Sequence, residues 1–505
     1  MKTIATQNGL LGMDTAVERF SGMQSSSPRS RAPSGLYADL VPLAAPLPGE
    51  QYGFEVDLDR CTSCKACVVA CHSLNGLGET EWWREVGMLT GGHEGGAWLQ
   101  TVTSACHHCL DPGCAEGCPV RAYEKDAVTG IVRHLDDQCI GCRYCEMKCP
   151  YGVPKYRTDL GIVRKCDLCV GRLQAGEAPA CVQACPAGAI RIRKVNIAEL
   201  REEDPDALMI PTAFPSGYTR PTTRYVSSKG VALGAVEVGG ETRGPEEAHL
   251  PLVWMLGLTQ VALGIEVSSL WGAFNGETKL ALNRELWAMV LLVAGLLGAV
   301  FHLGRPLGAW RFFLGLRTSW MSREILAFGF AVPITLGASW SAAFLEFTVF
   351  PRVAACLGLC VAVWTSGMIY VDTRRPGWSR GWVFGEFLST GVGTGLLSAF
   401  ALSGSGEGGA FVLWGLVAAW VGTASIRLPV DVRRFRHRVL PGNRWIDAAW
   451  LTLTGGLICA LDRARFGDFP GYLLALVLAA ASLWRRYVFF VGTPAPRMPI
   501  GGARC

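Results

Sequence analysis

The stretch QCIGCRYCEMKCPYG, residues 138–152, carries four cysteines at characteristic intervals. Cys139, Cys142 and Cys145 follow one another at three-residue steps, and Cys149 comes four residues later with Pro150 directly after it. Three thiols at this spacing can surround one metal centre. The fourth thiol points away from that centre, and the proline after it fixes the direction in which the chain continues. This stretch therefore predicts ligands for two neighbouring metal centres.

Groups of four closely spaced cysteines recur between residues 61 and 185, where 16 of the chain's 20 cysteines lie in four such groups. The groups are Cys61, Cys64, Cys67 and Cys71; Cys106, Cys109, Cys114 and Cys118; Cys139, Cys142, Cys145 and Cys149; and Cys166, Cys169, Cys181 and Cys185. Four thiolates hold one [4Fe–4S] cluster, and a trailing cysteine reaches the neighbouring cluster, so the groups must work in pairs. The sequence predicts four [4Fe–4S] clusters with no cysteine of these groups left over.

Two other uses of cysteine are less well supported. Structural zinc sites use Cys-x2-Cys pairs but need neither the third close cysteine nor the trailing Cys-Pro, and a zinc-binding membrane scaffold would be colourless. A disulfide framework is typical of small secreted domains, and the first 25 residues show no apolar run of secretory-signal length. His107 and His108 lie between two predicted ligands and are expected around the centre or at the surface, because cysteines already fill the coordination.

The second half of the chain is much more apolar than the first. Half of all residues are apolar, the mean hydropathy is +0.27, and 14 of the 17 tryptophans follow residue 250. Eight segments are long enough to span a membrane, at roughly 250–272, 285–303, 324–346, 350–371, 383–404, 409–427, 446–461 and 469–491. Such runs with so little charge between them favour a membrane bundle over a large soluble helical core.

These patterns predict a multi-domain protein. We expect a small α+β tandem ferredoxin-like domain with four clusters, followed by an all-α membrane bundle of about eight transmembrane helices. GIVRHL (130–135) and AIRIRKV (189–195) suit short strands of the first domain. The expected divisions are a disordered tail at 1–48, the ferredoxin domain at 49–200, a linker at 201–248, the anchor with a quinone site at 249–491 and a C-terminal tail at 492–505.

The cysteine-rich region resembles the four-cluster ferredoxin subunit of the dimethyl sulfoxide reductase family of molybdopterin oxidoreductases. The resemblance rests on CIGCRYCEMKCPYGVPKY (139–156) and KCDLCVGRLQAGEAPACVQACPAGAI (165–190) and spans about 53–195. It implies that the first group pairs with the fourth and the second with the third. The implied ligand sets are Cys61, Cys64, Cys67 and Cys185; Cys71, Cys166, Cys169 and Cys181; Cys118, Cys139, Cys142 and Cys145; and Cys106, Cys109, Cys114 and Cys149. Relatives with a tryptophan ligand and a three-iron cluster are not matched.

A second resemblance covers about 249–491 and rests on FHLGRPLGAWRFFLGLRTSWMSREILAF (301–328). This stretch is similar to the membrane anchor subunit of the same family, in which eight helices bind menaquinol without haem. The resemblance implies that His302 and Glu324 lie at a quinone site. The family's downstream arginine is not clearly matched, because Gly308 is near its place, and Arg305 or Arg311 are the candidates to replace it. Oxidation of a quinol releases two protons, for which a histidine or carboxylate is a suitable acceptor.

The sequence shows no pattern typical of haem, NAD or nucleic-acid binding. His249, His302 and His437 form no obvious pair across the bilayer, so we expect no haem. No Gly-rich fingerprint follows a strand, and GVGTG (391–395) lies in an apolar span where it favours helix packing, so we expect no NAD. A net charge of +5 without a basic tract gives no indication of nucleic-acid binding.

The loops between the predicted spans differ strongly in charge. Loops after the second, fourth and sixth spans hold 13 arginines, whereas the other loops hold five Lys or Arg residues. We expect a multi-pass protein of the bacterial inner membrane, and the positive-inside rule predicts that both termini and the ferredoxin domain lie in the cytoplasm. His302 and Glu324 fall at the same face. This orientation resembles the sulfite-oxidising members of the family rather than dimethyl sulfoxide reductase itself.

Taken together, the patterns and resemblances favour a fusion of two subunits that usually are separate chains. It would pass electrons between menaquinone or ubiquinone in the bilayer and a molybdopterin-containing catalytic subunit, and would not itself transform a small substrate. The alternative is an electron-transfer module of a larger respiratory assembly with cytochrome or ion-translocating partners, for which Glu266 and Glu386 are the mid-span acids. The sequence leaves open the terminal substrate, the direction of electron flow, the quinone type and proton pumping.

Overall fold

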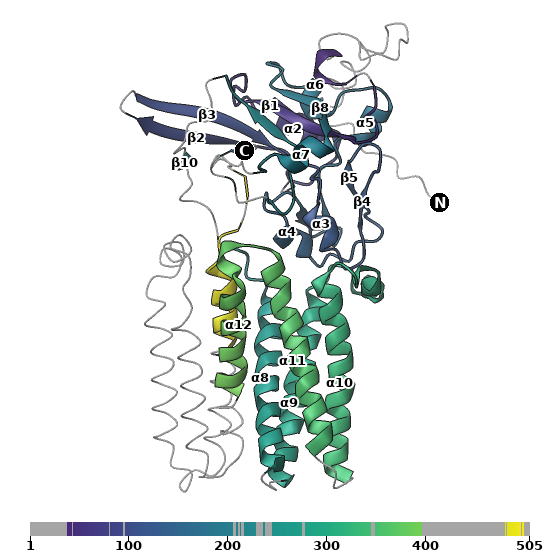
Figure 1. Ribbon diagram of the computed structural model, residues 1–505, viewed down its shortest axis with the longest axis vertical. Helices are drawn as coiled ribbons and strands as arrows, with labels where there is room; N and C mark the ends of the chain where they lie inside the picture. Colours follow the sequence, from purple (N-terminus) through teal and green to yellow (C-terminus); the bar gives the residue numbers. More distant parts are fainter. Residues whose placement is uncertain are drawn as a thin grey trace.

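The structure, a computed structural model, describes residues 38–395 and 480–498. Short gaps in these ranges fall at 43, 80, 94–95, 206–208, 211–212, 214–216, 229–235, 238–244, 275–277, 345–348, 481 and 496. A ferredoxin-like domain stands on the ends of a bundle of long helices (Figure 1). Of the expected tail at 1–48, residues 1–37 lie outside the described residues, as do the sixth and seventh expected spans.

A small sheet joins the beginning and the end of the ferredoxin domain. Strand β1 (Glu50–Asp57) pairs antiparallel with β8 (Ile190–Asn196) and parallel with β9 (Arg224–Val226), in the order β8-β1-β9. The predicted strand AIRIRKV is thus confirmed as β8. Because β1 leads into the first cysteine group and β8 follows the fourth, their pairing brings these two distant groups together.

Two short hairpins connect the remaining cysteine groups. Strands β4 (Tyr123–Lys125) and β5 (Val132–His134) pair between the second group and the third, which confirms GIVRHL as a strand. Strands β6 (Lys155–Arg157) and β7 (Ile162–Arg164) pair between the third group and the fourth. The helical elements of the domain are η1 (Ala38–Leu40), α2 (Ala66–Leu74), α3 (Gly113–Glu116), α4 (Tyr144–Lys148), α5 (Val170–Gln174), α6 (Ala180–Gln183) and α7 (Ile197–Glu202).

A longer hairpin projects from the side of the domain (Figure 1). It consists of β2 (Glu85–His93) and β3 (Gly96–Ser104), with β10 (Val236–Glu237) on the outer edge of β2. Both β9 and β10 come from the segment 201–248, whose composition predicts a surface linker. Parts of this segment instead complete two sheets, because each covers a strand edge that would otherwise present unpaired backbone groups.

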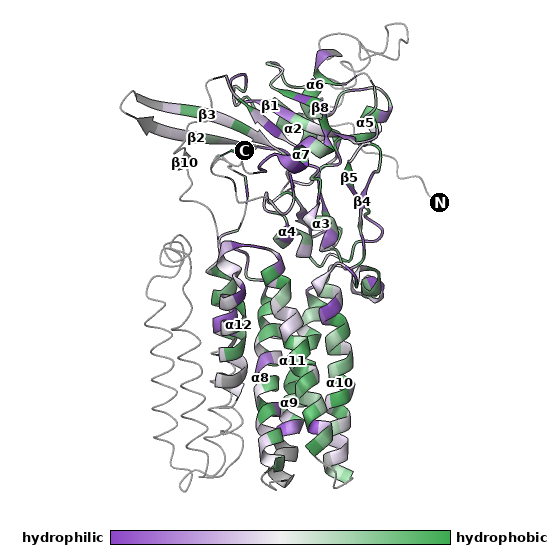
Figure 2. Cartoon of the chain, in the orientation of Figure 1, coloured by the Kyte–Doolittle hydropathy of each residue, from purple (hydrophilic) through white to green (hydrophobic). Residues whose placement is uncertain are grey.

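Among the described residues of the second half, four helices have the length and composition to cross a membrane. They are α8 (Leu250–Phe274), α9 (Thr278–Phe301), α10 (Trp320–Phe344) and α11 (Val349–Asp372), which match the first four expected spans. Apolar residues dominate these helices, whereas the ferredoxin domain is mixed (Figure 2). The fifth and eighth spans are described in part, by α12 (Arg380–Leu388), the π-helix η5 (Ser389–Thr394) and a helix over 482–491.

Glycines allow close packing where α8 meets η5. A Cβ on Gly264 would lie 1.9 Å from the carbonyl oxygen of Gly391, and Gly395 approaches the same glycine. GVGTG (391–395) therefore serves helix packing, as the sequence predicts.

The domain rests on the bundle through a dense interface. The loop after α9 leads into the 3₁₀ helix η3 (Pro306–Gly315), and a Cβ on Gly304 in that loop would lie 2.2 Å from the carbonyl oxygen of Gly161. Lys148 Nζ donates to Asp372 Oδ2 at 2.8 Å, near the short 3₁₀ helix η4 (Pro376–Trp378). One buried apolar cluster continues from the third cysteine group into the bundle.

Candidate metal centres and membrane site

Three pockets in the ferredoxin domain are each lined by four cysteines. The proximal set, closest to the bundle, is Cys118, Cys139, Cys142 and Cys145. The second set is Cys106, Cys109, Cys114 and Cys149. The distal set is Cys61, Cys64, Cys67 and Cys185. Each pocket thus gathers one of the ligand sets that the resemblance implies.

The remaining four cysteines, Cys71, Cys166, Cys169 and Cys181, form the third set. Burial raises the pKa of Cys71 to about 12, and repulsion from the thiolates of Cys181 and Cys169 adds to this shift. Cys166 in turn lies within electrostatic reach of Cys71 and Cys169. Electrostatic interactions thus connect the thiols of the third set, whereas each of the other three sets lines a pocket of its own.

The backbone curls in the same way in each cysteine group. The residue just before the second cysteine has a positive φ in all four groups, at Ser63 (62°), His108 (40°), Gly141 (67°) and Leu168 (59°). The left-handed conformation is costly for residues other than glycine, so the surroundings must enforce it. This turn allows the first two thiols of each group to face one centre.

Backbone amides also point at the thiols. Gly141 N donates to Cys139 Sγ at 3.4 Å, and Leu168 N donates to Cys166 Sγ at 3.4 Å. Ala122 N donates to Cys118 Sγ at 3.1 Å and Ala189 N to Cys185 Sγ at 3.3 Å. Hydrogen bonds to a sulfur stabilise its thiolate, which is the form that binds iron.

Buried cationic and imidazole groups among the cysteines test whether [4Fe–4S] clusters fit. Arg84 is 2% exposed, and its Nε and Nη2 have no hydrogen-bond partner among the described residues. Both ring nitrogens of His107 are likewise buried and unpartnered there, and burial lowers the pKa of His107 to about 3. Unpaired buried donors are expensive unless an anionic group lies beside them. Four-thiolate sets that hold clusters satisfy this requirement, so the residues fit the cofactor.

Ionisable side chains between the sets give their order in space. Tyr123 lies within electrostatic reach of Cys145 in the proximal set and Cys114 in the second set. Lys165 links the second and third sets in the same way. Arg84 lies within reach of both the third and the distal set. The order from the bundle outward is therefore proximal, second, third, distal, and the distal set includes the exposed Cys64.

The predicted membrane residue His302 touches the proximal set. Its Nε2 donates to the carbonyl oxygen of Cys142 at 2.9 Å, which leaves Nδ1 as the acceptor of a neutral imidazole. The ring of His249 lies against it, with the centroids 5.2 Å apart. No sequence pattern indicated this contact between the two histidines. The fold brings them together because α8 begins and α9 ends at the same face of the bundle.

Glu324, the other predicted residue, is also buried at the ferredoxin-facing end. Helix α10 begins at Trp320, so Glu324 lies in the second turn rather than at the first residue of its helix as predicted. Its carboxylate accepts a hydrogen bond from Ser366. Within the described residues no hydrogen bond or ion pair joins it to His302.

Tyr144, which no sequence pattern singled out, lies between the ferredoxin domain and this part of the bundle. Its hydroxyl donates to Asp372 Oδ2 and to the carbonyl oxygen of Ile369, both at 3.1 Å. Burial raises the pKa of Tyr144 well above its usual range, and Asp372 and Glu324 add to the shift. In the sequence, the one feature that could have drawn attention to Tyr144 is its position inside the third cysteine group.

The two candidate arginines for the quinone site serve the interface instead. Arg305 Nη1 donates to the carbonyl oxygen of Asp136 at 2.8 Å, and Arg311 Nη1 donates to that of Asp137 at 3.0 Å. Both guanidinium groups are thus bound to the ferredoxin domain. Of the two positions expected for His107 and His108, around the centre or at the surface, the structure shows the first: each is 1% exposed, and His108 Nε2 lies 4.0 Å from Cys166 Sγ.

Comparison with known proteins agrees with both halves. The 4Fe-4S dicluster domain family matches residues 98–195, and the dimethyl sulfoxide reductase anchor subunit family matches residues 246–426. The chain is 39% identical over 181 residues to the B subunit of the anaerobic dimethyl sulfoxide reductase of Haemophilus influenzae, covering 34% of this chain and 87% of the relative. The chain belongs to the dimethyl sulfoxide reductase family. It joins the family's iron–sulfur and anchor parts in one integral membrane protein.

Two further relatives show the breadth of the family's iron–sulfur part. The probable anaerobic dimethyl sulfoxide reductase subunit YnfG of Escherichia coli is 37% identical over 179 residues, which are 34% of this chain and 86% of the relative. The iron–sulfur subunit of the nitrate-inducible formate dehydrogenase of Escherichia coli is 34% identical over 170 residues, which are 29% of this chain and 56% of the relative. Similar iron–sulfur chains thus occur beside different catalytic activities.

The geometry predicts the effect of removing one ligand of the proximal set. We expect Cys142→Ser to lose or convert one cluster and to lower the iron content by up to about four atoms per chain. Electron paramagnetic resonance of the reduced protein, together with iron analysis, would measure the change. Cys360→Ser is the matched control, because this exposed cysteine of α11 lies outside the four sets. Unchanged cluster signals in Cys142→Ser would contradict the ligand assignment.

Proposed function

We propose that this chain carries electrons between a membrane quinone and a separate molybdopterin-containing catalytic subunit, through four [4Fe–4S] clusters held by the four thiol sets. A bound [4Fe–4S] cluster takes up and releases single electrons. The observation that carries the proposal is the hydrogen bond between His302 and the backbone of Cys142. It puts a residue of the expected quinone site in direct contact with a ligand of the proximal set.

The proximal and distal thiol sets are the two ends of the proposed electron path within this chain. The proximal set is buried against the bundle, whereas the distal set opens to the surface at Cys64. A catalytic subunit that covers the distal set would complete the path. The names of the relatives support dimethyl sulfoxide reductase-type electron transfer. A sulfite-dehydrogenase-like reaction in the reverse direction uses the same path with the opposite flow.

At the membrane end, His302 and Glu324 are the proposed quinone-site residues. A quinol must lose two protons as it gives up two electrons, and both side chains can accept a proton. Nδ1 of His302 is the acceptor of its ring, since Nε2 donates to Cys142. His249 would fix the orientation of the His302 ring through their edge contact.

The proposed setting is the bacterial inner membrane, with the ferredoxin domain in the cytoplasm and a bundle of eight helices that includes residues outside the described ranges. The loop after α9 and the loop after α11, both rich in arginine, lie beside the ferredoxin domain (Figure 1). On the opposite side, two of the five counted basic residues are held inside the bundle. Arg352 pairs with Glu285, and Arg284 donates to the carbonyl oxygen of Ser268. The difference in loop charge is therefore larger than the sequence count indicates.

The domain boundaries proposed are 49–200 for the ferredoxin domain and 249–491 for the anchor.

Substitutions of His302 test the quinone site. We expect His302→Leu to slow the oxidation of a menaquinol analogue at least tenfold while all four cluster signals persist, because the proton acceptor is lost but no ligand is. Steady-state oxidation by membranes or detergent-purified complex would measure the rate, and electron paramagnetic resonance would count the clusters.

His302→Gln separates the two roles of this side chain. Its amide can still donate to Cys142 but is not a base at neutral pH. If His302 accepts a proton, the glutamine variant will be as slow as the leucine variant. A glutamine variant with the normal rate would show that His302 only docks the ferredoxin domain, and normal rates in both variants would remove it from the site.

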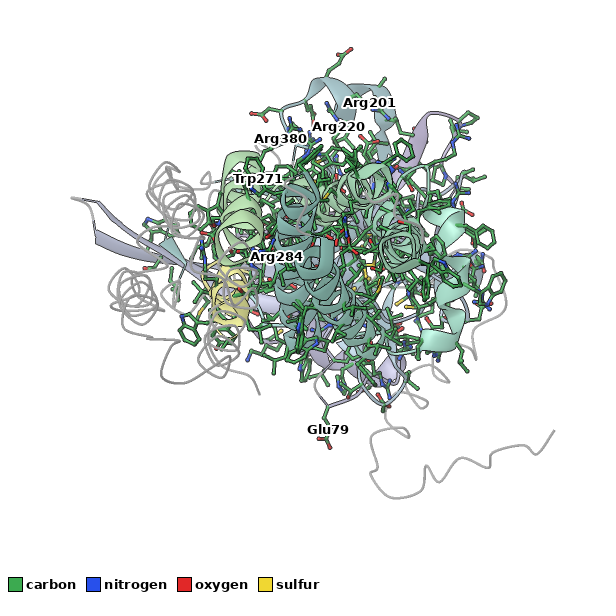
Figure 3. All side chains as sticks on the ribbon, turned by 90° about the horizontal axis from the view of Figure 1, so that it is seen from below. Glu79, Arg201, Arg220, Trp271, Arg284 and Arg380 are labelled. Carbon is green, nitrogen blue, oxygen red and sulfur yellow. The ribbon has the colours of Figure 1, made fainter. Side chains whose placement is uncertain are left out.

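A second candidate function is ion translocation by the anchor within a larger respiratory assembly, and one buried acid favours it. Glu266 on α8 is fully buried, and neither carboxylate oxygen has a partner among the described residues. It lies within electrostatic reach of the buried pair Glu285–Arg352. This end of the bundle faces away from the ferredoxin domain and is viewed in Figure 3, where Arg284 marks it. An ionisable group inside a membrane bundle is typical of proton paths.

The other mid-span acid gives no such support. Glu386 on α12 is bound by Arg485 Nη2 at 3.0 Å, and Arg486 Nη2 donates to its backbone carbonyl oxygen at 2.8 Å. This group has a structural role that accounts for its burial.

Glu266→Gln in liposomes distinguishes the two candidate functions. If the anchor only transfers electrons from quinol to the clusters, we expect no proton uptake from the side opposite the ferredoxin domain during quinol oxidation by the reconstituted complex. This result should be the same in the wild type and in the variant. A trapped pH-sensitive dye would measure this uptake. Uptake that is present in wild type and absent in Glu266→Gln, at equal oxidation rates, would instead establish translocation.

A further inference from the structure

Arg84 is an unusual residue to find inside the ferredoxin domain. It directly precedes β2 and is 2% exposed, deeper than any ordinary surface arginine. Its guanidinium carbon lies 4.7 Å from the centroid of the Phe54 ring, on β1. Nη1 donates to Thr103 Oγ1 at 3.2 Å, and this hydroxyl lies 3.7 Å from Cys67 Sγ. The base of the projecting hairpin thus fixes a cation among the cysteines.

This cation has no carboxylate to neutralise it among the described residues. Nε and Nη2 are without hydrogen-bond partners there, and the largest electrostatic influences on its charge come from thiolates. These belong to two sets: Cys71, Cys166 and Cys181 of the third, and Cys67 of the distal. Because a buried unpaired charge costs several kcal/mol, the fold tolerates Arg84 only if those two sets carry negative charge.

Lys165, the other cation between two sets, is a useful contrast. It links the second and third sets, but Nζ donates to the carbonyl oxygens of Val132 and Cys166, and Asp167 lies nearby. Its hydrogen bonds and a neighbouring acid therefore moderate its charge. The charge of Arg84 is the less compensated of the two.

We propose that Arg84 raises the reduction potentials of the clusters in the third and distal sets, and so sets the driving force along the outer half of the electron path. The proposal rests on the proposed function, because it needs clusters in those sets. An added electron makes a cluster more negative, and a fixed cation nearby stabilises that state. Arg84 is a positioning residue for charge: it binds no iron and transfers no atom.

The proposal predicts which clusters respond when the charge is removed. In Arg84→Gln, the reduction equilibrium constants of the third- and distal-set clusters should fall at least tenfold, which is about 59 mV for a one-electron step. The proximal and second clusters should not change, and they provide an internal control. Arg84→Lys keeps the charge and should recover most of the shift, whereas Arg84→Met is a second neutral variant if glutamine prevents assembly.

The measurement is a redox titration of the full-length chain in detergent, with dithionite as reductant, followed by electron paramagnetic resonance. Signals would be assigned to sets from single cysteine variants. The proposal is supported if the reduction equilibrium constants of the third- and distal-set clusters alone fall in a neutral variant, and do not fall in Arg84→Lys. Four intact signals without a selective fall would overturn it and leave the proposed function standing. Fewer than four clusters in the wild type would instead overturn the proposed function itself.

Discussion

Contact between the proximal thiol set and the ends of the membrane helices is the constraint on which this structure depends. Electrons move only between centres that lie close together, so the ferredoxin domain must meet the bundle at one particular loop. Gly304 and Gly161 allow the two backbones to approach, and a side chain at Gly304 would collide with a carbonyl oxygen. Lys148 and Tyr144 then bind Asp372 at the end of α11. The polar contacts orient the domain, and the buried apolar cluster continues beside them into the bundle.

The same contact involves the segments that join the two parts of the chain. The connecting segment is not a loose tether, since β9 and β10 take part in the sheets of the ferredoxin domain. Just before α8, Glu246 binds Arg375 in the loop after α11, and its backbone amide donates to the carbonyl oxygen of Thr493 at 2.9 Å. Farther along, Met498 is buried in the apolar core of the ferredoxin domain. Both sequence ends of the anchor are thus tied to the domain that stands on it.

The sequence predicted most where the chemistry is local. Cysteine spacing alone gives four groups, because loops that wrap a cluster require fixed intervals, and apolar length gives the first four spans. Which group pairs with which came from the resemblance, and the pairing of β1 with β8 supplies a physical reason for one half of it. Contacts between segments far apart in the sequence left no signal: His249 against His302, Tyr144 bound to Asp372, and Arg84 among the thiols. Arg305 and Arg311 were candidates to replace the family's arginine, and the fold uses both to bind carbonyl oxygens of the ferredoxin domain.

The most direct test of the account is the metal content of the complex that this chain forms in its native membrane. The tagged protein would be isolated in mild detergent, and iron and molybdenum would be counted per chain. The account predicts about sixteen iron atoms and about one molybdenum, with a large co-purifying catalytic chain. Sixteen irons without molybdenum, together with haem or other membrane subunits, would contradict it and place the chain in a different respiratory assembly.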